Sequence, residues 1–298
     1  MTNAKARPRD QAVTSTGLES SAVTGELTGE SGPVVLASSV IKVLSLLREP
    51  RVTPEDLERH ITPDAALSAQ VMRLANSVLY CVKRKATSVR EAVVVIGLSR
   101  LQDVVLLSGF AKILSSDMSV LGFAPSGLLA HSIAVSISAR MLATRIWTGA
   151  DIPDRLFVAG LVHKLHLVYR MRALRHGKTA RPGRTFILPD YSAALATSAL
   201  EGWGIDQQVI NLVRQQRMPV SPTGQCKELA ALRVATAVTD SLGIGYVAGC
   251  APAAMVNEAD LEQLSLHRPD VWDLLRESLV ADLEGSVSGL CGMLVTSA

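Results

Sequence analysis

Apolar residues recur at helical spacing along most of the chain, and the pattern is clearest over residues 61–80, ITPDAALSAQVMRLANSVLY. The apolar positions on one face of this segment are Leu67, Val71, Leu74 and Val78. Their spacing of three and four residues places them in one stripe, which must be buried. We predict that Thr62 caps the start of this helix, with Pro63 at its first position.

Two more helices are predicted before this segment. An apolar helical stripe follows Pro33 and stops at Pro50, because proline cannot continue a helix. Thr53 then caps a short helix that carries Pro54 inside its first turn.

After the same segment, the stretch TSVREAVVVIGLSRLQDVVLLSGFAKIL predicts a helix, a tight turn and a second helix. Ser88 and Glu91 form a capping box, and Gly97 suits the left-handed conformation that ends a helix. Ser99 and Gln102 are predicted to form a second capping box.

This helix, turn and helix could belong to a DNA-binding motif or to a packed core. A recognition helix needs several exposed polar side chains that reach the bases. The second helix has few, because its apolar positions are Leu101, Val104, Val105, Leu106, Leu107, Phe110, Ile113 and Leu114. We therefore favour a structural role, and we do not expect nucleic-acid binding.

The remaining periodic segments predict a second group of helices over residues 126–146, 151–174, 191–202, 206–216 and 227–242. The fold class is thus all-α, with two helical lobes over about residues 32–120 and 121–245. Residues 1–31 are rich in Ser, Thr, Gly and Glu, and we expect a disordered leader. Residues 246–298 are expected to form an acidic helical extension.

Composition agrees with a helical core inside the cell. Hydrophobic residues make up 48% of the 298 and aromatic residues only 4%, so the core must consist of aliphatic side chains. Apolar runs are far shorter than the roughly 20 residues that span a membrane, and no secretory signal is visible. The four cysteines are scattered. We therefore expect a cytoplasmic protein without membrane insertion.

Charge is distributed unevenly along the second half of the chain. Residues 155–189 contain eight basic residues and no acidic one: Arg155, Lys164, Arg170, Arg172, Arg175, Lys178, Arg181 and Arg184. The simpler explanation is a solvated loop after a helix, and the alternative is a site for an anionic ligand or an acidic protein. Residues 258–284 instead carry eight acidic and two arginine residues, which gives −8 + 2 = −6.

The sequences of several motifs resemble those of the HDOD domain family, the helical output domains related to HD-type phosphohydrolases. The segment PDAALSAQVMRLANSVLY is similar to the central helix of that family, SVREAVVVIGLSRL is similar to the next two helices, and the Trp203-Gly204 turn also recurs there. The resemblance covers about residues 33–245. It implies a two-lobed helical domain related to the HD-domain superfamily, with a non-enzymatic role in bacterial signalling.

The resemblance also locates the positions at which HD-type phosphohydrolases bind a divalent metal. These positions match His131, the pair His163-Lys164, and Asp240, and Lys164 stands where the metal-bridging aspartate belongs. A lysine ammonium has no lone pair to donate and carries positive charge. Two unit charges 4 Å apart interact by about 4 kcal/mol at an effective dielectric of about 20. We therefore predict no catalytic residue, no cofactor and no tightly bound metal.

Several interpretations remain open for these residues. His131 and His163 could be core histidines that bond helix carbonyls, and Lys164 could form a structural salt bridge with Asp240. The arginine and lysine residues from Arg170 to Arg184 are the candidate anion- or partner-binding residues.

The function that the resemblance implies is a regulatory protein that binds signalling proteins, including proteins of cyclic-di-GMP turnover or response regulators. The alternatives are a residual metal-dependent phosphohydrolase and a nucleic-acid-binding regulator.

Overall fold

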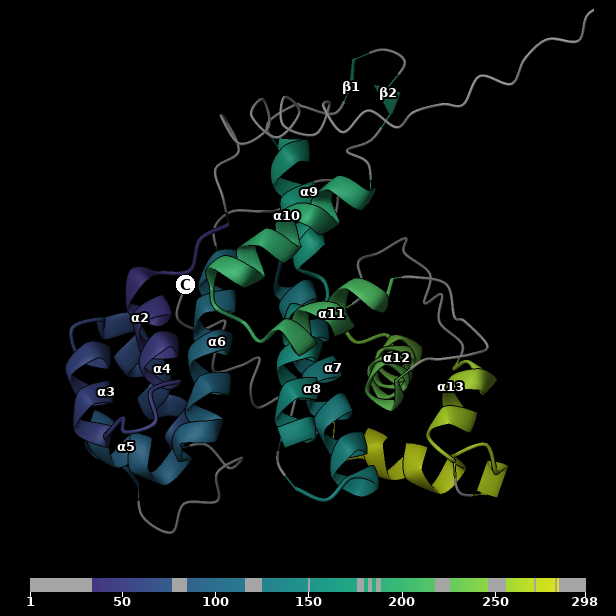
Figure 1. The fold of residues 1–298 in the computed structure, drawn as a ribbon, viewed down its shortest axis with the longest axis horizontal. Helices are drawn as coiled ribbons and strands as arrows, with labels where there is room; N and C mark the ends of the chain where they lie inside the picture. The colour runs from purple at the N-terminus through teal and green to yellow at the C-terminus, as the bar shows by residue number, and fades with distance from the viewer. Residues whose placement is uncertain are drawn as a thin grey trace, which may run out of the picture. The chain divides into compact units, whose positions relative to one another are not determined.

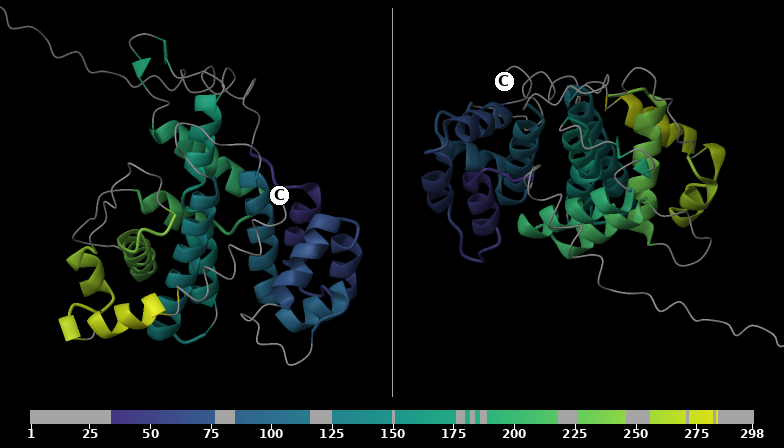
Figure 2. Two further views of the ribbon diagram at one scale, coloured as in Figure 1. Left: turned by 180° about the vertical axis from the view of Figure 1, so that it is seen from behind. Right: turned by 90° about the horizontal axis from the view of Figure 1, so that it is seen from above.

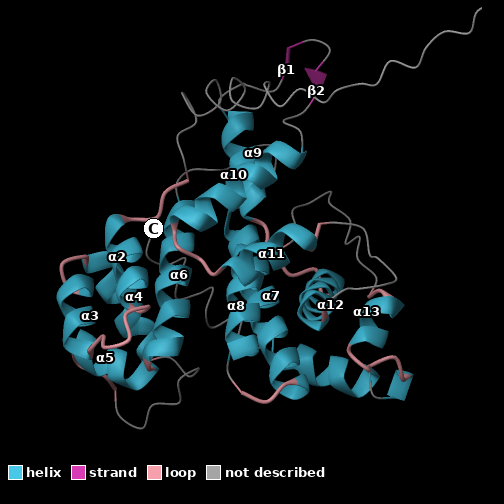
Figure 3. Cartoon of the chain, viewed as in Figure 1, coloured by secondary structure: helices cyan, strands magenta, loops and turns pink. Residues whose placement is uncertain are grey.

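A computed structural model describes residues 34–76, 85–115, 125–149, 151–175, 180–181, 184–185, 189–217, 226–245, 256–270, 272–281 and 283. These residues lie in one compact unit, Val34–Ala298, and nearly all of their regular structure is helical (Figure 1, Figure 3). The predicted all-α fold class is confirmed. The predicted leader over residues 1–31 lies outside the described residues.

The first lobe is the group of helices α2 (Ser38–Leu46), α3 (Pro54–Ile61), α4 (Ala65–Ala75), α5 (Val89–Ile96) and α6 (Leu98–Ser115). Helix α3 begins as predicted, because the Thr53 hydroxyl accepts from the backbone N–H of Asp56 and the Asp56 carboxylate accepts from that of Thr53.

Helix α4 begins two residues later than predicted. The cap is Asp64, whose carboxylate accepts from the backbone N–H of Leu67 at 3.0 Å, and not Thr62. Thr62 still has helical backbone angles and donates its N–H to Glu58 at the end of α3. The chain therefore leaves the helical conformation only at Asp64, where a capping residue must stand.

The turn between α5 and α6 is tighter than the sequence predicted. Ser88 caps α5, and Gly97 ends it with a φ of +79°, both as predicted. The second capping box is wrong, because α6 already begins at Leu98 and Ser99 lies inside its first turn. The carbonyl of Gly97 accepts from the N–H of Leu101, so the glycine itself provides the first bond of the new helix.

Helix α6 is buried on most of its surface. Its eight predicted apolar positions are between 0% and 5% exposed, which confirms the structural interpretation of this helix. A helix covered in this way cannot present the polar face that reading a major groove requires.

The second lobe contains α7 (Pro125–Ile146), α8 (Asp151–Val162), α9 (Leu165–Arg175), α10 (Pro189–Gly202), α11 (Gln207–Gln215) and α12 (Lys227–Ser241). A short antiparallel pair, β1 (Ala180–Arg181) and β2 (Arg184–Thr185), lies between α9 and α10, with Ala180 opposite Thr185. Helix α6 contacts both α7 and α8, and this contact joins the lobes (Figure 2).

Helix α7 forms the centre of the second lobe. It is long and apolar enough to cross a membrane by composition, but 72% of its apolar window is buried in the fold. This is the burial expected of the core helix in a soluble domain. Its contact with α8 is close at Gly160, where an added Cβ would lie 2.7 Å from the Cα of Ser136.

The acidic extension packs on the second lobe. It includes α13 (Glu258–Gln263) and a further helical stretch over residues 272–281. Asp260 on α13 lies 3.9 Å from Arg233 of α12, and Ser278 accepts from Arg145 of α7 at 2.9 Å. The described part of the extension thus contacts α12 and α7.

Candidate functional site

The fold brings the predicted HD-site positions together at the centre of the second lobe. His131 comes from α7, His163 and Lys164 form the turn between α8 and α9, and Asp240 lies in the last turn of α12. The His131 and His163 ring centroids are 5.3 Å apart. His131 Nδ1 lies 3.6 Å from the Asp240 carboxylate, and all of these residues but Lys164 are buried.

Glycines let three backbones approach one another around His131. Gly160 places α8 against α7 at the level of Ser136, as described above. Gly245, at a φ of +75°, lies so close that a side chain there would meet the carbonyl of Gly127 and the backbone of His131. The turn after α12 is therefore held against the start of α7, and the Ile244 carbonyl lies 3.4 Å from His131 Nδ1.

Both histidines are held in the neutral form. Burial is the largest cause that lowers the pKa of each, and the nearby Lys164 charge lowers both pKa values further. His163 Nδ1 is 2.6 Å from the Gly160 carbonyl, which can only accept, so this nitrogen carries the proton. His163 Nε2 therefore bears a lone pair, and this buried atom has no hydrogen-bond partner.

Charges of both signs act on the Lys164 ammonium. Burial lowers its pKa, the Asp240 carboxylate opposes this change, and Arg217 adds to it. The described residues contain no direct ion pair between Lys164 and Asp240, so the predicted salt bridge is present only as a longer-range attraction. His166 is also half-buried, and burial together with Arg217 lowers its pKa to about 3.

These residues do not fit a divalent metal. Within the described ranges, no three His, Cys, Asp or Glu side chains are arranged to hold an ion. Asp240 is the one carboxylate among the four HD-site positions, and the Lys164 charge would repel a cation placed beside His163. These four positions thus supply two neutral imidazoles, one carboxylate and one ammonium, which is a poor ligand set for a divalent cation.

The six candidate anion-binding residues do not form one cluster among the side chains that the structure describes. Arg170 and Arg172 lie half-buried on α9, and burial lowers the pKa of Arg172. The backbone of Arg175 ends α9, that of Arg181 lies in β1 and that of Arg184 in β2. Lys178 lies outside the described residues. The basic run thus begins on helices α8 and α9, and not in a loop.

Sequence reasoning missed a buried ionic cluster between the lobes. Asp103 of α6, 2% exposed, pairs with Arg140 of α7, which also lies 3.2 Å from Asp154 of α8. The Arg140 guanidinium stacks 3.8 Å from the centre of the Phe157 ring. Burial raises the pKa of Asp103 to about 6, although Arg140 opposes the rise. The available signal was one acidic residue inside the apolar stripe of α6.

Sequence comparison identifies a known domain in the chain. The HDOD domain family model matches residues 34–181, which include the first lobe, His131, His163 and Lys164. These residues of the chain are an HDOD domain. No curated protein gives a significant sequence match to the chain.

Three solved structures share the fold at low sequence identity. An HDOD domain protein from Geobacter sulfurreducens is 20% identical with a TM-score of 0.61, and the alignment covers 87% of this chain and 91% of that one. A proposed phosphohydrolase from Shewanella amazonensis SB2B is 19% identical with a TM-score of 0.63, covering 93% and 100%. A proposed signal-transduction protein from Marinobacter aquaeolei VT8 is 22% identical with a TM-score of 0.64, covering 88% and 59%.

Proposed function

We propose that the chain is a non-catalytic regulatory protein of the bacterial cytoplasm, which acts by binding other signalling proteins. The observation that carries this proposal is Lys164 beside His163, close enough to lower the pKa of both histidines and to be attracted by the Asp240 carboxylate. A cation at this position opposes the binding of a metal ion. The family resemblance supports partners that include proteins of cyclic-di-GMP turnover or response regulators.

The groove between the lobes is the docking place that we propose for a partner. It lies between α6, α8 and α11 and has a volume of about 290 Å³. Among the described residues that line it, Asp154 is paired with Arg140 at 3.2 Å and Arg155 with Glu228 at 2.8 Å, which leaves Asp151 and Asp206 as carboxylates without an ion pair. This excess of carboxylates favours a partner segment that carries lysine or arginine residues.

The Lys164→Asp substitution tests the absence of catalysis. It restores a carboxylate beside His163 and changes the charge there by two units, so we expect Mn²⁺ affinity to rise at least about tenfold in calorimetric titration. Lys227→Asp makes the same charge change at an exposed position at the start of α12 and should leave Mn²⁺ binding unchanged. A sub-micromolar Mn²⁺ site in the wild type, lost in His163→Ala, would contradict the proposal.

Partner capture from the native bacterial cell tests the docking place. Asp151→Lys reverses an exposed charge at the rim of the groove, in the first turn of α8. Glu258→Lys makes the matched change at an exposed position in the first turn of α13. We expect a captured signalling protein to be lost with the first variant and retained with the second. Equal capture by both variants would rule out this groove.

One observation favours a second candidate, a residual metal-dependent phosphohydrolase. His163 Nε2 is a buried lone pair without a hydrogen-bond partner, which is the form of imidazole that binds a metal. Hydrolysis of bis(p-nitrophenyl) phosphate by the wild-type chain with Mn²⁺, abolished by a chelator and by His163→Ala, would support this candidate. No ion-dependent hydrolysis is expected under our proposal.

A further inference from the structure

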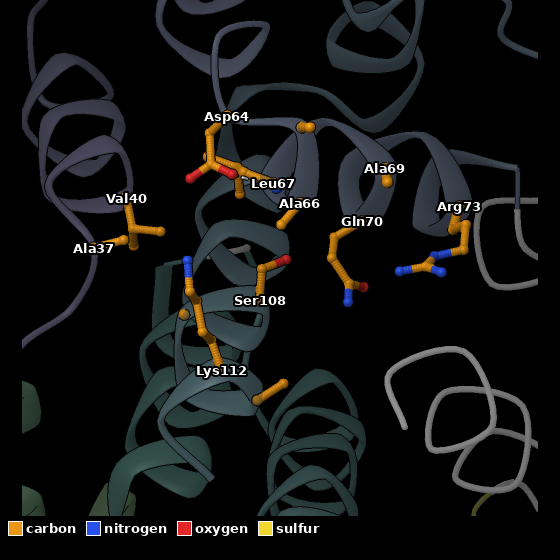
Figure 4. Close-up of a pocket in the computed structure, with 13 residues that line it drawn as sticks. Ala37, Val40, Asp64, Ala66, Leu67, Ala69, Gln70, Arg73, Ser108 and Lys112 are labelled. Carbon is orange, nitrogen blue, oxygen red and sulfur yellow. Dashed lines mark hydrogen bonds between the residues drawn. The ribbon is translucent and has the colours of Figure 1, made fainter. Parts of the chain in front are cut away.

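A cavity in the first lobe lies apart from the HD-site positions. It is bounded by α2, α4 and α6 and has a volume of about 500 Å³, within the range of small-molecule sites (Figure 4). Figure 4 shows Gln70 and Arg73 on α4, and Asp64 just before it, facing Ser108 and Lys112 on α6 across this space.

Small side chains create the cavity. Six of its lining residues have at most one side-chain carbon: Ala37, Ala65, Ala66, Ala69, Gly109 and Ala111. Gly109 lets the segment around α2 pack closely on α6, because a Cβ there would lie 2.6 Å from the end of the Leu36 side chain and 3.2 Å from Val40. The walls are therefore mostly apolar, and they suit the hydrocarbon part of a ligand.

The charges at the Asp64 end of the cavity offset each other. The Asp64 carboxylate accepts from the Ser39 hydroxyl at 2.6 Å and from the Leu67 N–H at 3.0 Å. These bonds, and more weakly the Lys112 charge, lower the pKa of Asp64, so it is anionic at neutral pH. Its engaged oxygens and the facing ammonium leave no net charge at this end.

The Arg73 end carries net positive charge. The buried Nε of Arg73 has no hydrogen-bond partner, and no carboxylate among the described side chains forms an ion pair with this guanidinium. Gln70, 8% exposed, brings an amide to the same end, and Figure 4 shows the two groups close together. A buried guanidinium donor that lacks an acceptor costs free energy, which an anionic ligand would recover.

We propose that this cavity binds a small monocarboxylate with an apolar body. The carboxylate would accept from the Arg73 guanidinium, and the hydrocarbon would lie against the alanine walls toward Ser108. A single cation at this end matches one negative charge, while the far end, where the Asp64 and Lys112 charges offset each other, offers no net positive charge for a second one. Such a ligand would give the first lobe a chemical input that the proposed function does not include.

Titration calorimetry with octanoate and 1-octanol tests this assignment on the full chain. Octanoate should bind the wild type at least about tenfold more tightly than 1-octanol, because only the carboxylate can accept from Arg73. Arg73→Met keeps the side-chain stem and should lower octanoate affinity at least about tenfold, without changing 1-octanol affinity. Arg59→Met, at a side chain that is 73% exposed on α3, is the matched control.

Ala69→Leu fills the cavity from an exposed helix position and should abolish binding of both compounds, without relying on the charge of Arg73. Circular dichroism confirms that each variant is folded. The proposal is overturned if octanoate does not bind the wild type at millimolar concentration, if 1-octanol binds equally well, or if Arg73→Met and Ala69→Leu both bind octanoate as the wild type does.

Discussion

The buried pair of Asp103 and Arg140 should respond in opposite ways to loss of one partner or the other. A rise in the pKa of Asp103 from 3.8 to about 6 means that its ionised form costs the fold about 3 kcal/mol, even with Arg140 present. Asp103→Asn removes that charge at constant size, so we expect it to leave stability unchanged or to raise it by up to about 3 kcal/mol at pH 7. Arg140→Met leaves the carboxylate buried without its partner and should cost about 3–5 kcal/mol.

Urea unfolding at pH 7 and pH 5 measures both effects. The folded pKa of Asp103 exceeds the unfolded one, so the folded state takes up its proton first and wild-type stability from this group rises as pH falls through 6. Between pH 7 and pH 5 this gain is about 1 kcal/mol, and Asp103→Asn lacks it. Asp270→Asn, at an exposed carboxylate paired with Arg268, is the control and should change stability by less than about 1 kcal/mol. Destabilisation by Asp103→Asn as large as that by Arg140→Met would refute the reasoning, because the ion pair would then outweigh desolvation.

Two further predictions concern the turns around the HD-site positions. Wild-type His166, with a folded pKa of about 3, takes up a proton between pH 7 and pH 5 only when the chain unfolds, so acid lowers the free energy of unfolding. His166→Gln should reduce this loss between pH 7 and pH 5 by about 2 kcal/mol, and equal shifts of the urea midpoint in both proteins would contradict this. Gly245→Ala should lower the free energy of unfolding by about 3 kcal/mol or more, because strain at a φ of +75° adds to a clash with Gly127. The control is Gly243→Ala, at a φ of +67° with open space around it, which should cost only about 1 kcal/mol. Similar costs for both variants in thermal or urea unfolding would show that the backbone angle alone decides the effect.

Helix positions were predictable because the apolar stripes are long and the residues that start and end helices are characteristic. Thr53, Ser88 and Gly97 act at helix ends as their chemistry predicts. The errors at Thr62 and Ser99 have one cause, which is that very short turns join neighbouring helices. The Thr62 N–H is bonded to Glu58 at the end of α3, and the Gly97 carbonyl accepts the first bond of α6 before Ser99 is reached. A local motif cannot reveal this competition, because it depends on how closely two helices follow each other.

The candidate site was predictable in its residues and not in its geometry. Resemblance to a family placed His131, His163, Lys164 and Asp240 in one cluster, and the fold does bring them together. Whether Lys164 contacts Asp240 depends on side-chain conformations, which the spacing of residues in the sequence does not determine. The pairing of Asp103 with Arg140 joins residues 37 positions apart, and it required the contact of α6 with the second lobe.

Helix α6 contributes side chains to two separate sites along its length. Asp103, in the second turn of α6, joins the ionic cluster with α7 and α8, and Ser108 and Lys112, about one and a half and two and a half turns later, line the cavity beside α4. A side chain or ligand that displaced the later turns would therefore strain a buried charge pair at the other end of the same rigid element. The two lobes would then be energetically coupled through one helix, with no need for a flexible hinge between them.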